Sequence, residues 1–483
     1  MNFIKKNWIL IAILLVGAFL RLYKIDSYMT FLGDEGRDVI IVRNLLVNVD
    51  PILIGPGTSV GGMYLGPLYY YFMAPFLLLA NFSPVGPAIG VALLGVATIY
   101  LVYKAGRDWF SEKTGLFTAI LYAISPTVIT FSHSSWNPNI MPFFALLSVY
   151  SIWKVWKLKQ FKWLLICSVS YAFVLQSHYL GLLLGPILLI YWFLAKVPLK
   201  YNLIPLFVFL FLMSPLVIFD FRHDFMNSKA LYKFITVREE TVSIKPWTVI
   251  PRLFPIFEQI NESLLIAKNI IFGKIITLLL SSFLIFSFFK NKKLFTNQYS
   301  LITLWLLVGL VGFGIYKQPV YDHYFGFLFP VPFLFTGAFL SKIYESKYKI
   351  FSVLMLGYLV SINLINSPIR NYPNNQMQRA KNVSTKVLEI AQGNPFNLAV
   401  LAERNYEDGY RYFMELSGAQ VMHAVRWDQK TIVDNLIVIC EMPQEKCDPT
   451  HSPKAEVANF GWSKIENQWT VDGVIIYKLI HTQ

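Results

Sequence analysis

The chain has 483 residues, of which 55% are hydrophobic, 16% aromatic and only 14% charged. Soluble globular proteins carry about 25% charged residues, so this composition argues against a soluble enzyme and predicts a protein that crosses a membrane many times. The formal net charge of +14 would suggest nucleic-acid binding in a soluble chain. Here it is explained by lysines in cytoplasmic loops near anionic lipid headgroups, and no nucleic-acid partner is predicted.

Apolar segments recur along most of the chain. A membrane span needs about 20 mostly apolar residues, and we expect about eleven spans. The first resembles a signal peptide, but no small-residue cleavage site follows it, so we interpret it as a retained transmembrane helix. The predicted spans are 8–23, 86–103, 115–132, 139–156, 163–179, 181–195, 202–219, 269–289, 300–316, 324–341 and 350–366.

The distribution of basic residues predicts the orientation. Lys and Arg are enriched in cytoplasmic loops of membrane proteins. With eleven spans, all the basic loops lie on the same side as the N-terminus. We therefore expect a multi-pass protein of the plasma membrane with a cytoplasmic N-terminus and an extracytoplasmic C-terminus. The basic residues are Lys5 and Lys6 and those of the loops 104–114, 154–162, 196–200, 290–293 and 342–349.

The chain after the last span has the pattern of a small α/β domain. The predicted fold is an all-α polytopic membrane domain over 1–366, followed by an extracytoplasmic α/β domain over 367–483. Cys440 and Cys447 lie outside in this topology, so a disulfide is allowed, but two free cysteines fit equally well. Within the tail we expect helices over 377–393 and 406–418, the second ending at a C-cap glycine, and strands over 397–403, 435–442 and 473–481.

Charges are concentrated directly after the first span, in the stretch from Phe31 to Leu46. Asp34, Arg37 and Asp38 share one face if this stretch is helical, because positions i, i+3 and i+4 are neighbours. Asp34 could simply cap the helix, with Glu35 favoured by the helix dipole and the apolar face buried in the membrane interface. Charges between membrane-facing segments also indicate function, and capping and catalysis are compatible.

Further polar side chains lie at the predicted outer ends of spans, where a binding site could form. Tyr64 belongs to a stretch, 61–76, that could line a groove for an acyl or polyprenyl chain or could be a packing loop. Trp can serve as an interfacial anchor, and Asn before Pro can cap a span. The remaining candidates for substrate binding are Trp136, Asn137, His178, Tyr179, Tyr321 and Asp322.

Four cationic or imidazole side chains are candidates for binding a phosphate group. Guanidinium matches phosphate in a bidentate fork, although a solvated loop start explains the same residues. No zinc spacing, Walker A loop or nucleophile elbow is present. The candidates are Arg222, His223, Lys317 and His323.

Three of these motifs together resemble the GT-C glycosyltransferases, specifically the family-39 protein mannosyltransferases and the bacterial aminoarabinose transferase type. They are FLRLYKIDSYMTFLGDEGRD at the end of the first span, YLGPLYYYFMAP after it and the late YDHYF before a span. The resemblance covers about residues 8–340. It rests mainly on Asp34 and Glu35 in their context.

The resemblance implies a transferase that uses a polyprenyl-phosphate sugar donor on the outer face of the membrane. Asp34 would then act as general base on the acceptor hydroxyl, or orient it, with Glu35 beside it. Such a base must lie within hydrogen-bond reach of the hydroxyl, and the leaving phosphate needs positive charge nearby. The acceptor could be a protein, a lipid or a cell-wall polymer.

The chain departs from this family at one motif. Many relatives carry Glu-Lys-Pro-Pro where this sequence has Tyr64, Leu65, Gly66 and Pro67. A second acidic group and a lysine are therefore absent, so we predict no obligatory metal or other cofactor, although a divalent cation remains possible. A transporter or flippase of lipid-linked glycans is the main alternative, but internal repeats and charged residues at mid-membrane, which are typical of transporters, are not evident. A scaffold whose tail binds cell-wall glycans is a third alternative.

Overall fold

The computed structural model describes residues 2–59, 61–236, 245–290 and 297–482, which excludes Lys292, Lys293 and part of the long loop at 237–244. Contacts divide the chain into two compact units. The first comprises Met1–Tyr23, Pro51–Pro75 and Pro87–Tyr372, and the second comprises Lys24–Asp50, Phe76–Gly86 and Pro373–Gln483. The second unit thus combines the tail with two segments from the first quarter of the chain. The domain limits 1–366 and 367–483 stay a prediction.

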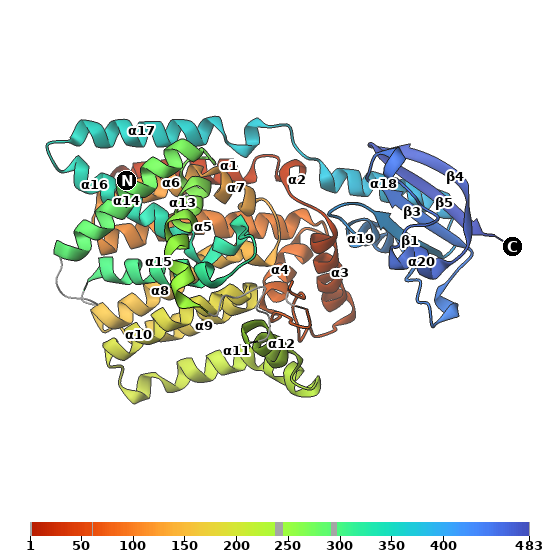
Figure 1. Ribbon diagram of the computed structural model, residues 1–483, viewed down its shortest axis with the longest axis horizontal. Helices are drawn as coiled ribbons and strands as arrows, with labels where there is room; N and C mark the ends of the chain where they lie inside the picture. Colours follow the sequence, from red (N-terminus) through yellow and green to blue (C-terminus); the bar gives the residue numbers. More distant parts are fainter. Residues whose placement is uncertain (1, 60, 237–244, 291–296, 483) are drawn as a thin grey trace. The chain divides into compact units, whose positions relative to one another are not determined.

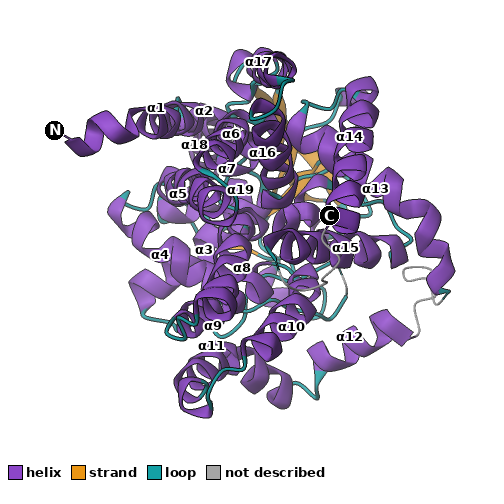
Figure 2. Ribbon diagram, turned by 90° about the vertical axis from the view of Figure 1, so that its left-hand side faces the viewer, coloured by secondary structure: helices purple, strands orange, loops and turns teal. Residues whose placement is uncertain are grey.

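The first unit consists of helices and the loops between them, whereas all five strands belong to the second unit (Figures 1 and 2). Two helices, α4 (Leu68–Leu79) and α5 (Val85–Trp109), each have one end in the second unit. The other helices of the first unit are α1 (Asn2–Leu22), α6 (Glu112–Ile124), α7 (Pro126–Ser132), α8 (Met141–Leu158), α9 (Trp163–Ser177), α10 (Gly185–Ala195), α11 (Leu203–Arg222), α12 (Met226–Thr236), α13 (Ile250–Leu265), α14 (Ile270–Lys290), α15 (Gln298–Ile315), α16 (Pro330–Tyr344) and α17 (Lys349–Ile365).

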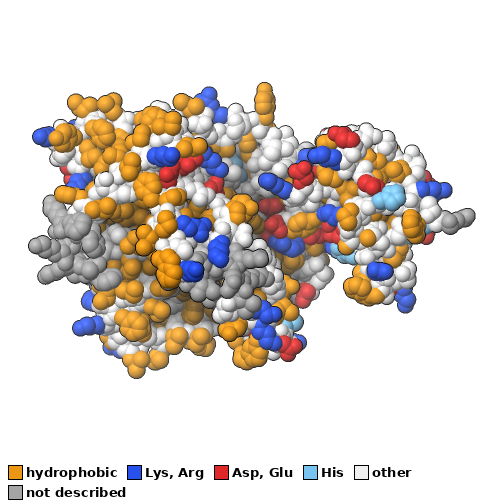
Figure 3. All heavy atoms as spheres, viewed as in Figure 1, with side chains coloured by type: hydrophobic (Ala, Val, Ile, Leu, Met, Phe, Trp, Pro, Cys, Tyr) orange, Lys and Arg blue, Asp and Glu red, His pale blue; other side chains and the backbone are white. Residues whose placement is uncertain are grey.

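The first unit is apolar inside and outside, as a membrane domain should be. Its core buries large aromatic side chains such as Trp305 and Phe325. At the same time Phe207 and Phe211 of α11 are about two-thirds exposed, at 69% and 65%. Hydrophobic side chains are spread over its visible face (Figure 3). Because a soluble protein rarely exposes so much contiguous apolar surface, this surface is suited to lipid.

The helix lengths bear on the number of spans. Among the described residues, four helices are long and apolar enough to cross a membrane, or up to six segments if each of two bent pairs forms one span. One bent pair, α6 with α7, turns by 64° at a break and covers the predicted span 115–132. Shorter apolar helices at Asn7–Leu22, Trp163–Ser177 and Lys349–Ile365 coincide with three other predicted spans. The total of eleven stays a prediction.

The second unit is built on a five-stranded sheet with strand order β2-β1-β3-β5-β4. The strands β2, β1 and β3 are parallel, whereas β5 runs antiparallel to both β3 and β4. The small helix α20 covers one face, where Val457 and Phe460 pack with side chains of β1, β3 and β5. The elements are β1 (Phe396–Leu401), β2 (Val421–Met422), β3 (Asn435–Cys440), β4 (Ser463–Val471), β5 (Val474–His481), α18 (Gln376–Ala391), α19 (Asp408–Leu416) and α20 (Ala455–Phe460).

The predicted α/β tail is confirmed in outline. Both helices and all three strands form close to their expected positions, and α19 is followed by Gly418 with a left-handed φ of +85°. Cys440 and Cys447 form a disulfide, which decides between the two states that the sequence left open. The sequence did not reveal β4, β2 or α20. Six of the nine residues of β4 are exposed, so this edge strand lacks the alternating apolar pattern of a half-buried strand.

The helix α3 (Gly33–Asn48) carries the acidic stretch and packs against α19 of the tail. A Cβ atom at Gly36 would lie 2.3 Å from the backbone of Asp408 and Gly409, so the two helices touch backbone to backbone. Val39 and Val42 of α3 are buried. At these two positions the apolar face of α3 is therefore covered by protein, where we expected the membrane interface.

Candidate functional site

Asp34 lies in the first turn of α3, and its carboxylate is held by two donors. Arg37 donates from Nη1 to Oδ1 at 2.9 Å, and the hydroxyl of Tyr406 donates to the same oxygen at 2.6 Å. The side chain of Asp34 is 43% exposed. Neither donor contacts the second oxygen, Oδ2, so the carboxylate is both oriented and accessible.

Glu35, not Asp34, has the capping role. Leu32 is the N-cap residue, and its backbone N–H donates to the Glu35 carboxylate at 3.0 Å. Burial is the main reason that the pKa of Glu35 is raised to about 8, and the nearby charges of Asp34 and Asp38 contribute smaller increases. Glu35 is therefore largely protonated near neutral pH and would be a poor general base there.

Arg37 bridges the two aspartates of α3, as the predicted shared face requires. Its guanidinium donates to Asp34 and also to Asp38, at 2.7 Å from Nη2 and 3.0 Å from Nε. Asp38 is fully buried. A buried carboxylate needs such a partner because desolvation otherwise disfavours its charge. Asp38 thus holds the Arg37 guanidinium in place, and Arg37 in turn orients the Asp34 carboxylate.

The sequence reasoning missed Asn405 and Tyr406, which complete this cluster from the tail. The Asn405 side-chain oxygen accepts from the backbone N–H groups of Gly33, at 2.8 Å, and Tyr406, at 2.9 Å. Asn405 and Tyr406 are each 372 positions from their partners Gly33 and Asp34 in the chain. No local sequence pattern identifies these two residues. The only local signal is the pair of acidic residues, Glu407 and Asp408, that follows Tyr406.

In the first unit, predicted residues from three separate motifs form an aromatic and imidazole cluster. The ring of His323 lies 4.7 Å from Trp136 and 6.3 Å from His178, measured between centroids. Tyr321 stacks parallel to His323 at 5.9 Å, and Tyr179 stacks on His178 at 4.4 Å. The three motifs therefore meet at one place.

The members of this cluster differ in their hydrogen bonds. The Nδ1 atom of His178 accepts from the backbone of Leu180 at 3.2 Å. Among the described residues, His323 has ring neighbours but no hydrogen-bond partner, so its ring nitrogens are available to a ligand. Asn137 donates to the backbone oxygen of Ser177 at 2.6 Å, which is a structural role at the end of α9.

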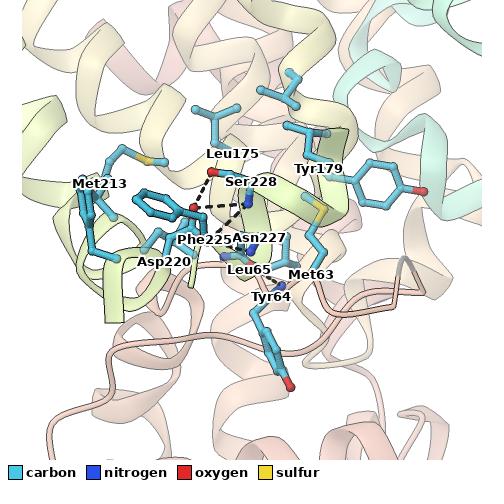
Figure 4. A pocket seen from close by; sticks show the side chains of 15 residues that line it. Met63, Tyr64, Leu65, Leu175, Tyr179, Met213, Asp220, Phe225, Asn227 and Ser228 are labelled. Atoms are coloured by element: carbon cyan, nitrogen blue, oxygen red, sulfur yellow. Dashed lines mark hydrogen bonds between the residues drawn. The ribbon is translucent and has the colours of Figure 1, made fainter. Parts of the chain in front are cut away.

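An apolar pocket of about 360 Å³ opens beside this cluster (Figure 4). Its walls come from the segment Met63–Leu65, α9, α11 and α12. Tyr179 lines the pocket and also stacks on His178, so the pocket and the cluster adjoin. The presence of Tyr64 in the wall agrees with the groove expected for the stretch 61–76.

Polar groups close one side of the pocket. Asp220 accepts from the backbone N–H of Asn227 at 2.7 Å and from Ser228, and Asn227 in turn accepts from the backbone N–H of Tyr64 at 2.8 Å. Figure 4 shows these hydrogen bonds as dashed lines among Asp220, Asn227, Ser228 and the backbone of Tyr64. Asp220 and Asn227 were not among the predicted residues, although Asp220 lies two positions before the predicted phosphate ligand Arg222.

The remaining predicted phosphate ligands lie outside the aromatic cluster. Arg222 and His223 end α11 and are exposed, and the Nδ1 atom of His223 lies 2.8 Å from the backbone oxygen of Phe219. Lys317 is exposed in the loop after α15. Asp322 forms an ion pair with Lys268 at 2.8 Å. Their roles in binding stay predictions.

No group of three or more His, Cys, Asp or Glu side chains is placed to hold a metal ion within the described part of the chain. Near Asp34, the neighbouring carboxylate of Asp38 is engaged by Arg37. A guanidinium thus occupies the position between two carboxylates that a cation could otherwise take. Metal dependence stays a matter for experiment.

Known proteins share both sequence and fold with this chain. Residues 65–219 match the family described as dolichyl-phosphate-mannose-protein mannosyltransferase. No curated protein sequence matches the chain significantly. The matched segment includes the pocket wall at Leu65 and both Trp136 and His178. The predicted resemblance to GT-C glycosyltransferases is therefore confirmed.

Solved structures extend the likeness over the whole chain. The structure of ArnT from Cupriavidus metallidurans bound to undecaprenyl phosphate is similar with a TM-score of 0.63 and 12% identity, and the match covers 98% of each chain. An oligosaccharyltransferase from Archaeoglobus fulgidus, in complex with Zn and sulfate, is similar with a TM-score of 0.57 and 13% identity over 89% of this chain and 67% of that one. The chain thus shares the fold of these two proteins and has a small C-terminal sheet domain.

Proposed function

We propose that this protein is a glycosyltransferase that moves a sugar from a polyprenyl-phosphate donor to an acceptor hydroxyl on the extracytoplasmic face of the membrane. It would be a multi-pass protein of about eleven spans with the N-terminus in the cytoplasm. The observation that carries the proposal is the Asp34 carboxylate, which Arg37 and Tyr406 orient through Oδ1, while no hydrogen bond to Oδ2 is found among the described residues.

The apolar pocket and the cluster beside it support the donor class. A polyprenyl phosphate needs an apolar channel for its chain and hydrogen-bond donors for its phosphate. The pocket supplies apolar walls. Tyr179 lines the pocket and stacks on His178, which in turn lies against His323, so both imidazoles are near the pocket. The fold is also that of ArnT, whose structure contains undecaprenyl phosphate, and of an archaeal oligosaccharyltransferase, AglB, in complex with a dolichol-phosphate.

The role proposed for Asp34 follows from the chemistry of a nucleophilic displacement. The acceptor oxygen attacks the anomeric carbon while its proton passes to Asp34, and the bond from that carbon to the phosphate oxygen breaks. General base catalysis of this kind contributes about 10²–10⁴-fold to a rate. The electron pair leaves with the polyprenyl phosphate, whose developing negative charge needs hydrogen-bond donors nearby.

Asp34→Asn tests the proposal because the amide keeps the shape of the side chain and removes the base. We expect transfer from a polyprenyl-phosphate donor to fall by about 10²-fold or more, with unchanged thermal unfolding. Asp26→Asn, in the same unit and next to Ser27, should leave transfer near the wild-type rate.

Two results would count against this function. If Asp34→Asn retains full transfer, Asp34 is not the base. If the purified protein moves lipid-linked glycan across vesicle membranes without transfer, it is a transporter or flippase instead.

A further inference from the structure

Tyr406 makes the shortest of the contacts to Asp34 and comes from a distant part of the chain. Its hydroxyl donates to Asp34 Oδ1 at 2.6 Å, and Arg37 Nη1 lies 2.9 Å from that oxygen and 3.3 Å from the hydroxyl. The three groups form a closed triangle. Two donors on a single oxygen fix the plane of the carboxylate more firmly than one donor can.

The tail holds Tyr406 in this position. A Cβ atom at Gly33 would lie 2.4 Å from the Tyr406 ring, so only glycine allows the ring to lie against the start of α3. Asn405 accepts from the backbone of both Gly33 and Tyr406. Asn405 itself donates to Glu441, the residue that follows β3. The hydroxyl is therefore placed by the sheet domain and not by α3.

Tyr406 can only donate to Asp34 at physiological pH. Burial, together with the hydrogen bond to Asp34, raises the pKa of the Tyr406 phenol well above its ordinary value. The phenol thus remains protonated, and the carboxylate accepts. A donor of this kind favours the ionised form of a carboxylate.

We infer that Tyr406 is a positioning residue for the general base: the C-terminal domain orients Asp34 through this hydroxyl and turns Oδ2 toward the acceptor. This inference rests on the proposed function. It assigns the tail a part in the reaction itself, in addition to any acceptor binding. Tyr406 does not exchange a proton in the step; the acceptor proton goes to Asp34 Oδ2.

Tyr406→Phe tests the inference because it removes the hydroxyl and keeps the ring beside Gly33. We expect kcat to fall about tenfold to hundredfold, as for loss of a hydrogen bond to a charged group. The acidic limb of the pH–rate profile should move to higher pH, because the ionised carboxylate loses a donor. The other charged groups near this hydroxyl, Arg37, Asp38 and Asp408, are unchanged by the substitution.

Tyr412→Phe is the matched control. The Tyr412 hydroxyl also belongs to the second unit but donates to the backbone oxygen of Phe82, away from Asp34 and from the Asn405–Glu441 pair. Its removal should leave the pH–rate profile in place. If both variants lose activity equally with no shift of the acidic limb, Tyr406 only stabilises the fold and the inference is wrong.

A double variant separates this inference from the proposed function. In the Asp34→Asn background, Tyr406→Phe should have no further effect on transfer, because both changes act through one group. If Asp34→Asn abolishes transfer while Tyr406→Phe has the wild-type profile, only the inference fails. If Asp34→Asn is fully active, the proposed base and the inference both fail.

Discussion

The acidic cluster on α3 and the aromatic cluster of the first unit hold their polar side chains by different means. On α3, Asp34 and Asp38 are held by ion pairs and by Tyr406, which comes from the tail. In the other cluster, His323 is surrounded by the rings of Trp136 and Tyr321. Ion pairs and short hydrogen bonds set the orientation of a side chain such as Asp34. Ring packing sets the position of His323 but leaves its ring nitrogens available to a ligand.

This difference fits the division of work in the proposed reaction. A general base must present one oxygen to one hydroxyl, so its orientation matters most. A phosphate has several equivalent oxygens, and donors around it need less directional precision. Substitutions that alter each cluster should therefore have different kinetic signatures, and the following predictions use this contrast.

The largest effect is expected where α3 meets α19. Gly36→Val places side-chain atoms where even a Cβ would lie 2.3 Å from the backbone of Asp408 and Gly409. Overpacking of this kind costs about 3 kcal/mol or more when backbone must move. We expect a lower unfolding temperature of the purified protein, and loss of transfer because Asp34 is displaced from Tyr406.

The control for this variant is Gly357→Val in α17, where no heavy atom lies within 4 Å of the added Cβ. Both positions are helical glycines, so the intrinsic helix preference of valine is the same in each. Equal loss of stability in the two variants would show that the contact at Gly36 is unimportant.

A smaller effect is expected in the aromatic cluster. His323→Phe keeps a ring against Trp136 and removes both nitrogens. We expect transfer to fall about tenfold to hundredfold through the lost charge-assisted hydrogen bond to phosphate. The KM for the donor should rise, and the acidic limb of the pH–rate profile should stay in place, in contrast to Tyr406→Phe.

His451→Phe serves as the control because this histidine is exposed on the tail, with 72% of its side chain accessible. It should behave as the wild type. If His323→Phe leaves the donor KM unchanged, the cluster does not bind the donor phosphate.

How far the sequence could predict the site depended on the range of the interactions. Trp136, His178 and His323 were chosen because each lies at the end of an apolar segment, and ends of spans on one side of a membrane must lie at a similar level. The cluster on α3 was recognised from its local charge. Its partners Asn405 and Tyr406 were not, because the pairing of α3 with the tail depends on contacts between segments far apart in sequence.

The fold shows the same limit. Apolar length identified most helices, because burial in lipid leaves a strong composition signal. No pattern in the sequence indicated that Lys24–Asp50 packs with the tail. That contact depends on two glycines, Gly36 and Gly409, which let α3 and α19 approach. Glycine in a helix has no unique signature, so the close crossing could not be predicted.

The smallest predicted effect concerns Glu35 and the pH dependence of stability. Burial raises the pKa of Glu35 to about 8 in the folded protein, whereas an unfolded chain has an ordinary glutamate pKa of about 4.3. Between these values the folded state binds more protons than the unfolded state, so stability falls as pH rises. The stabilisation of the folded state by the raised pKa of Glu35 is fully present below about pH 4 and is lost as the pH rises through about 8.

Glu35→Gln removes this titration and keeps an acceptor for the Leu32 N–H. Thermal unfolding between about pH 5 and pH 9 should therefore show a weaker fall for the variant than for the wild type. Asp408, whose pKa burial raises to about 6, still titrates in both and accounts for the slope that remains. Glu389→Gln, on an exposed glutamate of α18 paired with Lys386, should reproduce the wild-type slope. An identical slope in Glu35→Gln would show that Glu35 is ionised when folded, and Glu35 would then compete with Asp34 as the base.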